Sequence, residues 1–216
     1  MPRAKGVKNA DYEDKRRELL GRMLPRFASL DLERPSLRQL AVAAEVTAPT
    51  LQHYFGDRIG VVAALLEEYN SRGRTRLDMV SKANGGFSAS MRDFAHGFVF
   101  GMQARATVRL GDVMAAALCE GLADPQVSPL ALAHILDPAV DALAARLQVH
   151  VDRGEMIAAD VRAAALMLLS PLLLAVLHQD QMKGRESRHM ELGDLAEQVS
   201  AAFVRAYAAP GPRRDD

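Results

Sequence analysis

The sequence predicts an all-α protein. Alanine, leucine and arginine recur through its 216 residues, and the runs of Val, Ile and Thr that are typical of strands are missing from it. Apolar residues return instead at intervals of three and four, which is the period of an amphipathic helix. Hydrophobic residues make up 49% and charged residues 25%, a composition typical of globular domains.

The cysteine content and the charge distribution limit the kinds of site that the protein can hold. The single Cys119 excludes an internal disulfide and a cysteine-based zinc site, and it fits a cytoplasmic protein. The basic first residues are not followed by an apolar stretch, so we expect no signal peptide. The net charge is zero, yet residues 1–58 hold eleven Lys and Arg against eight Asp and Glu, a net charge of +3. A surface that contacts phosphates is therefore expected near the N-terminus.

The first predicted helix spans residues 11–30, after a basic, flexible arm at residues 1–10. Pro25 is expected to kink its last turns. A loop follows at residues 31–35. The inner face of the helix carries Leu19, Leu20, Met23, Leu24 and Phe27.

Two short helices joined by a tight turn are predicted at residues 36–55, where Ser36 and Thr47 are suited to cap them. Helices this short are not stable alone in water, so they must pack on neighbours. Their inner faces carry Leu37, Leu40, Ala41, Leu51 and Tyr54, and the second leaves Thr50, Gln52 and His53 outward. A polar outer face on this pattern is typical of a helix-turn-helix, whose partner is the major groove of DNA.

Longer helices are predicted over the rest of the chain. Asp57 is suited to cap a helix that runs to about residue 80, and Asp160 one that runs to about residue 182 with Pro171 inside it. The longest apolar run, residues 163–177, is shorter than the roughly 20 residues of a membrane span, so we expect a buried helix. One further helix is expected to start at Ser88 or Ser90, and another to span 108–122. A third is expected to start at Ser128, to restart or kink at Asp137 and to stop at Gly154, and the last to span 190–207.

One segment follows the pattern of a known family. It comprises Ser36, Leu40 and Ala41, residues 44–47 and 49–52, Tyr54 and Phe55, Arg58, and the apolar residues 61–66. These residues resemble the tetracycline-repressor (TetR) family of transcriptional regulators. A short helix-turn-helix pattern alone is a weak signal, but the Tyr-Phe-x-x-Arg ending makes the resemblance specific. Residues 153–156 and 170–173 also fit the family.

The resemblance implies a three-helix DNA-binding head at residues 1–56, an effector-binding and dimerisation domain at 57–209, and a disordered tail at 210–216. It implies a ligand-responsive regulator, a repressor that binds a near-palindromic DNA operator as a homodimer and is released by a small, largely hydrophobic effector. We expect no cofactor, no metal and no membrane partner. The DNA-binding candidates are Ser36, Arg38, Gln39, Thr47, Ala48, Pro49, Thr50, Gln52, His53, Tyr54 and Arg58.

Two further sets of residues are candidates for the second domain. Apolar residues at helical spacing usually form plain core, and they can equally line a ligand cavity. The candidate cavity residues are Phe87, Phe94, Phe98, Met102, Val113, Met114, Leu118 and His134. The candidate dimer interface is a four-helix bundle through Leu166, Leu169, Leu173, Leu177, Leu195, Val199 and Phe203.

Three departures from the family pattern leave the operator sequence open. Glu45 and Pro49 stand where the family has glycines, and Gln52 replaces an aromatic residue. If the turn needs a positive φ, Glu45 costs about 1–2 kcal/mol there. The sequence offers no arrangement typical of an enzyme, because the histidines lack metal-ligand spacing and Cys119 has no histidine near it. Two alternatives remain: a DNA-binding occlusion protein without a ligand, and a helical ligand-binding protein that has lost DNA binding.

Overall fold

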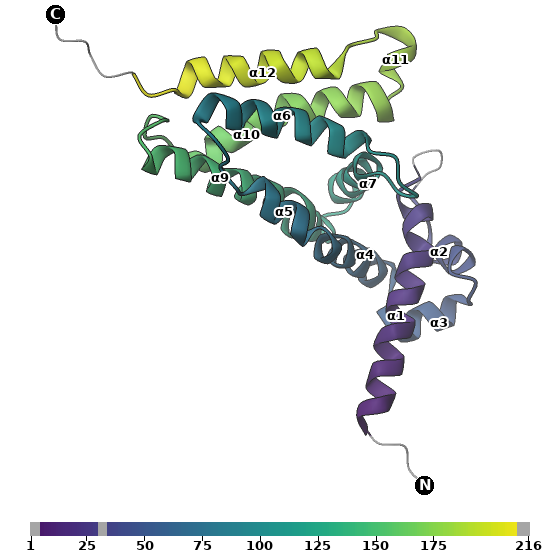
Figure 1. Ribbon diagram of the computed structural model, residues 1–216. Helices are drawn as coiled ribbons and strands as arrows, with labels where there is room; N and C mark the ends of the chain where they lie inside the picture. The colour runs from purple at the N-terminus through teal and green to yellow at the C-terminus, as the bar shows by residue number, and fades with distance from the viewer. Residues whose placement is uncertain (1–4, 30–33, 211–216) are drawn as a thin grey trace, which may run out of the picture. The chain divides into compact units, whose positions relative to one another are not determined.

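The computed structural model describes residues 5–29 and 34–210, which form helices and turns (Figure 1). The all-α class is confirmed, since the extended pairing within these residues is limited to an isolated bridge between Met156 and Ala208. The predictions for residues 1–4, 30–33 and 211–216 lie outside the described part.

The chain divides into two compact units. Unit 1 comprises Met1–Arg72, Ala106–Val108 and Asp112–Ile135, and unit 2 comprises Gly73–Arg105, Arg109–Gly111 and Leu136–Asp216. This division differs from the predicted boundary after residue 56. Residues 57–72 of the predicted 57–80 helix join the N-terminal helices, and so do two later segments, 106–108 and 112–135.

Unit 1 combines the N-terminal helices with the segment 112–135. Its core is formed by Leu19, Leu20, Met23, Phe27, Leu40, Leu51, Val61, Val62, Leu65 and Leu66, which are buried. The apolar stripe predicted for the first helix is therefore confirmed at four of its five positions, with Leu24 half-buried. The helices of unit 1 are α1 (Lys5–Phe27), α2 (Leu37–Ala43), α3 (Ala48–Phe55), α4 (Arg58–Arg72), α7 (Leu110–Ala123) from Asp112 onward, and α8 (Ser128–Ala131).

The first and fourth helices differ from their predicted limits. Helix α1 begins at Lys5, so residues 5–10 are helical rather than a flexible arm. The predicted helix from Asp57 divides at Gly73 into α4 and α5 (Arg74–Val80). Glycine has the largest backbone entropy to lose in a helix, which makes it a natural point of division. Asp57 caps α4 as predicted, because its Oδ1 accepts a hydrogen bond from Gly60 N at 2.9 Å.

Unit 2 is a layered helical bundle. Figure 1 shows α6 (Phe87–Gln103) beside α12 (Leu192–Tyr207), and both pack against α10 (Val161–Val176), which also packs on α9 (Asp137–Asp152). A π-helical turn (Leu177–Gln181) and α11 (Gly184–Ser187) connect α10 to α12. The buried side chains at the centre are Met91, Phe94, Val99, Met102, Leu143, Leu147, Leu168, Leu172, Val176, Leu192 and Phe203.

Several predicted helix boundaries can be compared directly. Asp160 caps α10 with its carboxylate, and Gly154 ends the preceding helix with φ 69°. Helix α6 starts after Gly86, not at a serine cap, since Ser90 is buried and bonds Arg146. Ser128 does not cap α8 either, because its hydroxyl donates to the Gly121 carbonyl at 2.8 Å. A π-helical turn (Leu132–Leu136) separates α8 from the restart at Asp137.

Helix α10 is apolar on most of its surface. Together with the π-helical turn, Val161–Gln181 has the length and composition of a membrane-spanning helix, a test that the core helix of a soluble protein also passes. One face of α10 is buried within unit 2, as predicted. Leu166, Met167 and Leu174 on the other face are 47%, 62% and 65% exposed. The sequence prediction of a buried helix therefore holds for one face only.

Candidate nucleic-acid interface

Helix α2 is fixed at its start by reciprocal hydrogen bonds. The Ser36 hydroxyl accepts from Gln39 N at 3.3 Å, and Gln39 Oε1 accepts from Ser36 N at 2.8 Å. This capping box satisfies two backbone donors that a helix start would otherwise leave open. Ser36, Arg38 and Gln39, all DNA-binding candidates, are exposed.

The turn after α2 uses a left-handed residue. Glu45 has φ 57°, and Val46 N donates to the Ala41 carbonyl while Glu45 N donates to the Val42 carbonyl, both at 3.0 Å. This is the Schellman arrangement, in which glycine is the usual left-handed residue. The turn therefore has the positive φ that glycine favours, with Glu45 in its place.

Helix α3 presents the polar face that the sequence predicts. Thr47 caps it by accepting from Thr50 N at 3.3 Å, and the two threonine hydroxyls are hydrogen-bonded at 2.9 Å. Pro49 lies in the first turn, where its missing N–H breaks no helical bond. Leu51 is buried beneath the helix. The candidates Thr47, Pro49, Gln52 and His53 are exposed, and Ala48, Thr50 and Tyr54 are half-buried.

Helix α1 holds the end of α3 through contacts that the sequence did not predict. The rings of Tyr12 and Tyr54 are stacked with centroids 4.8 Å apart, and His53 lies edge-on to Tyr54 at 5.2 Å. One turn along α1, the Arg16 guanidinium lies 5.1 Å from the centroid of Phe55. Tyr12 and Arg16 are four residues apart, so a shared helical face was the available signal.

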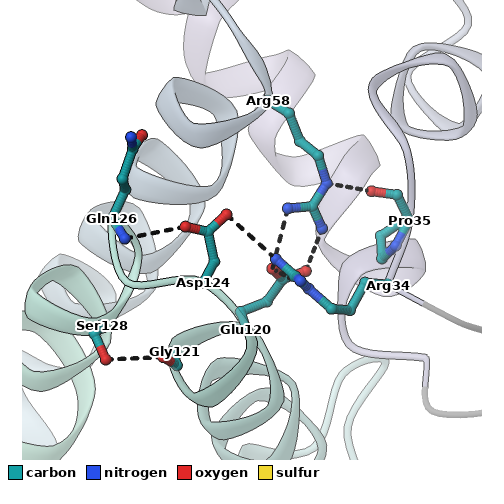
Figure 2. A network of polar contacts seen from close by, with 8 residues as sticks. All are labelled: Arg34, Pro35, Arg58, Glu120, Gly121, Asp124, Gln126 and Ser128. Atoms are coloured by element: carbon teal, nitrogen blue, oxygen red, sulfur yellow. Dashed lines mark hydrogen bonds and ion pairs between the residues drawn. The ribbon is translucent and has the colours of Figure 1, made fainter.

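The Arg58 side chain is turned into unit 1. Its Nε donates to the Pro35 carbonyl at 2.8 Å, and its two Nη atoms bond the two oxygens of Glu120 on α7 (Figure 2). Arg34 bonds the same carboxylate, and this hydrogen bond raises the pKa of Arg34 above its ordinary value. The resemblance assigned Arg58 to DNA and did not predict its contact with Glu120, because nothing local pairs residues 62 positions apart.

The candidate cavity residues are divided between the two units. Phe87, Phe94, Phe98 and Met102 lie on α6 in unit 2, whereas Val113, Met114, Leu118 and His134 lie in unit 1. Phe98, Leu118 and His134 are half-buried, and the other five are buried. Within unit 2, Phe94 and Phe98 stack on each other at 6.0 Å, and Phe87 lies against His150 and Phe203.

The candidate dimer residues do not share one outward face. Leu169 and Phe203 are only 4% and 6% exposed, so they pack inside unit 2 and are not available to a partner. Leu173, Leu177, Leu195 and Val199 are half-buried, and Leu166 is exposed. The described residues contain no group of His, Cys, Asp or Glu arranged to hold a metal ion.

Neither a protein-family model nor a curated protein matches the sequence. Solved structures do match it. One from Mesorhizobium loti, described as a TetR-family transcriptional regulator, has a TM-score of 0.73 at 17% identity and covers 92% of this chain and 98% of its own. Reduced Escherichia coli NemR has a TM-score of 0.68 at 17% identity, covering 92% and 100%. SmeT of Stenotrophomonas maltophilia, described as the repressor of a multidrug efflux pump, has a TM-score of 0.63 at 20% identity, and the match covers 91% of each chain. The chain therefore has the fold of TetR-family regulators, with a helix-turn-helix head and a helical C-terminal region.

Proposed function

We propose that this protein is a DNA-binding transcriptional regulator of the TetR type, acting in the cytoplasm. One observation carries the proposal: α3 is capped at its start, is held against α1 at its end, and exposes Gln52 and His53. An amide at Gln52 can pair with adenine in the major groove, and His53 reaches the neighbouring bases or phosphates. Because the family's glycines are replaced in this chain, we do not carry over the operator sequence of any family member to it.

The proposed action is repression. SmeT, which shares the fold, is described as a repressor. A repressor that occupies a promoter needs high affinity in the absence of its signal and loses it when the signal binds. We propose a small, largely hydrophobic effector as that signal. The aromatic and apolar candidates on α6 are the residues that we assign to its recognition within unit 2, with Phe94 and Phe98 at its centre.

We propose that the protein binds DNA as a homodimer. The support is the stripe of Leu166, Met167 and Leu174 on the exposed face of α10, which continues through Ser170 and Pro171. A second copy that packs the same stripe against it forms a two-fold interface, and α12 lies beside α10 to complete a four-helix bundle. Two copies of α3 then read half-sites about 34–36 Å apart on a near-palindrome.

An electrophoretic mobility-shift assay tests the DNA-binding proposal. The probes are the upstream regions of the protein's own gene and of its neighbours, with random duplex of equal length as competitor. Gln52→Ala and His53→Ala should each weaken binding to a retarded fragment, whereas Lys82→Ala, an exposed change in unit 2, should not. Retardation of no fragment would reject the proposal.

Effector release is measured on the fragment that the wild type retards. A hydrophobic ligand that binds should lower DNA affinity, and Phe98→Ala should weaken its effect without changing DNA affinity in its absence. DNA binding that no ligand alters would favour the occlusion protein without a ligand. Ligand binding without DNA binding would favour the ligand-binding protein that has lost DNA binding.

A further inference from the structure

Glu120 is a buried carboxylate with two guanidinium partners. Its side chain is 2% exposed, and both oxygens are engaged by arginines from the N-terminal part of unit 1 (Figure 2). An isolated buried charge is costly, so a carboxylate in this position requires partners. Two guanidinium groups, those of Arg34 and Arg58, share this one buried carboxylate.

The two arginines bind the carboxylate in different ways. Arg34 places Nε and Nη2 on one oxygen, Oε2, at 2.8 and 2.7 Å, and its Nη2 also lies 3.7 Å from Asp124. Arg58 spans both oxygens with its two Nη atoms. If Arg58 leaves, Glu120 keeps the hydrogen bond from Arg34 Nε and the ion pair with Arg34 Nη2, so it remains neutralised. A buried carboxylate without a partner would be strongly destabilising. Departure of Arg58 does not create one, because Arg34 stays bound to Glu120.

Arg58 occupies the boundary between this network and the helix-turn-helix. It is the first residue of α4, it follows the end of α3 by three positions, and its Nε bonds the Pro35 carbonyl beside the α2 cap Ser36. Its side chain is 24% exposed, whereas Glu120 is enclosed. In a helix-turn-helix complex the flanks of the two helices lie along the phosphate backbone. A guanidinium fork fits a carboxylate and a phosphate by the same paired hydrogen bonds, so it cannot bind both fully at once.

We propose that Glu120 competes with DNA phosphate for Arg58 and thereby lowers the affinity of the protein for DNA. Glu120 acts through Arg58 and is a positioning residue. This inference rests on the proposed DNA binding and adds a residue that regulates its affinity. Because a phosphate contact carries no sequence information, the competition changes affinity for every duplex alike. One additional phosphate contact steepens the dependence of log K on log salt by about 0.9.

Glu120→Gln in the full chain tests the proposal. Fluorescence anisotropy gives the dissociation constant for the fragment that the wild type retards and for a random duplex, over a salt series. We expect the variant to bind both DNAs more tightly. Its advantage over the wild type should be roughly three- to fourfold larger at about 50 mM than at about 200 mM salt, as one added phosphate contact requires.

Two matched variants separate competition from general charge. Asp124→Asn makes the same charge change in the same network but removes only a 3.7 Å contact to Arg34, so its salt slope should equal that of the wild type. Arg58→Ala in the Glu120→Gln background should abolish the gain. If Glu120→Gln does not fold by circular dichroism, Glu120→Asp, whose carboxylate is drawn back from Arg58 by one methylene, should show the same steeper slope.

An unchanged salt slope, weaker binding by the folded variant, or an equal gain from Asp124→Asn would each overturn the competition. These outcomes leave the proposed function standing, because the wild type still binds DNA. Absence of DNA binding by the wild type would reject the proposed function itself and this inference with it.

Discussion

Arg22 on α1 donates a hydrogen bond to the Glu45 carboxylate at 2.7 Å, and Glu45 holds the left-handed turn between α2 and α3. The ion pair is exposed, so it contributes about 0–1 kcal/mol. The left-handed backbone costs a non-glycine residue about 1–2 kcal/mol. The turn therefore combines a strained backbone with a weak compensating contact.

Replacement of Glu45 separates the two effects. Glu45→Ala loses the ion pair and keeps the strain, whereas Glu45→Gly loses both and gains unfolded-state entropy. Relief of strain exceeds that entropy, so we expect the glycine variant to be more stable than the alanine variant by roughly 0.5–1 kcal/mol. Urea unfolding followed by circular dichroism measures the difference. Equal stability of the two variants would show that the turn is not strained.

Gly60 provides a close approach between α4 and the end of α3. A Cβ atom at this position would lie 2.0 Å from the Phe55 carbonyl oxygen, so the backbone at the end of α3 must move to admit it. We expect Gly60→Ala to destabilise the protein by about 1–3 kcal/mol, the usual cost of overpacking. It should also weaken DNA binding, because the displaced segment carries His53 and Tyr54.

Gly21→Ala is the matched control for Gly60→Ala. Gly21 is an exposed glycine inside α1, and a Cβ atom added to it would meet no heavy atom within 4 Å. Alanine there should stabilise the helix by roughly 0.5–1 kcal/mol and leave DNA affinity unchanged. Thermal unfolding of both variants gives the comparison, and a shift of the same sign in both would contradict the role assigned to Gly60.

Tyr12 is expected to hold α3 at its C-terminal end. Its ring stacks on Tyr54, and its hydroxyl donates weakly to the Tyr54 carbonyl at 3.4 Å. Tyr12→Ala should cost about 1–2 kcal/mol of stability from the lost stacking and burial. Operator affinity, measured by anisotropy on the folded variant, should fall several-fold because Tyr54 and His53 lose their support.

Tyr12→Phe tests which part of the side chain matters. The ring is kept and only the long hydrogen bond is lost, so both stability and DNA affinity should stay near the wild type. A phenylalanine variant as impaired as the alanine variant would assign the effect to the hydroxyl.

Local signals predicted the helix-turn-helix well. Ser36 and Thr47 cap their helices through bonds that span three residues, and such spacing is visible in the sequence. The apolar positions of α1 to α4 also followed the helical period. Gly73 was different, because a helical pattern can tolerate a single glycine as well as divide at it.

Long-range choices could not be predicted in the same way. Arg58 could have faced solvent, phosphate or a carboxylate, and only the packing of α7 beside it selects Glu120. On α10 the apolar residues surround the helix, so periodicity could not separate the face with Leu169, which is buried, from the face with Leu174, which is exposed. The sequence therefore did not predict the contacts of side chains whose partners lie far along the chain.

The exposed stripe on α10 gives the last prediction. Leu174 is 65% exposed and has no charged residue of α10 beside it, so Leu174→Glu places a carboxylate within the proposed interface with little effect on the folded chain. Burial of two such charges against each other is unfavourable, so the variant should sediment as a monomer at micromolar concentration where the wild type is a dimer. Met79→Glu, a similarly exposed apolar position on α5, is the control and should leave the dimer intact. Since one head alone contacts only one half-site, the monomeric variant should also lose most of its operator affinity. A wild type that sediments as a monomer, or a Leu174→Glu variant that stays dimeric, would contradict the proposed interface.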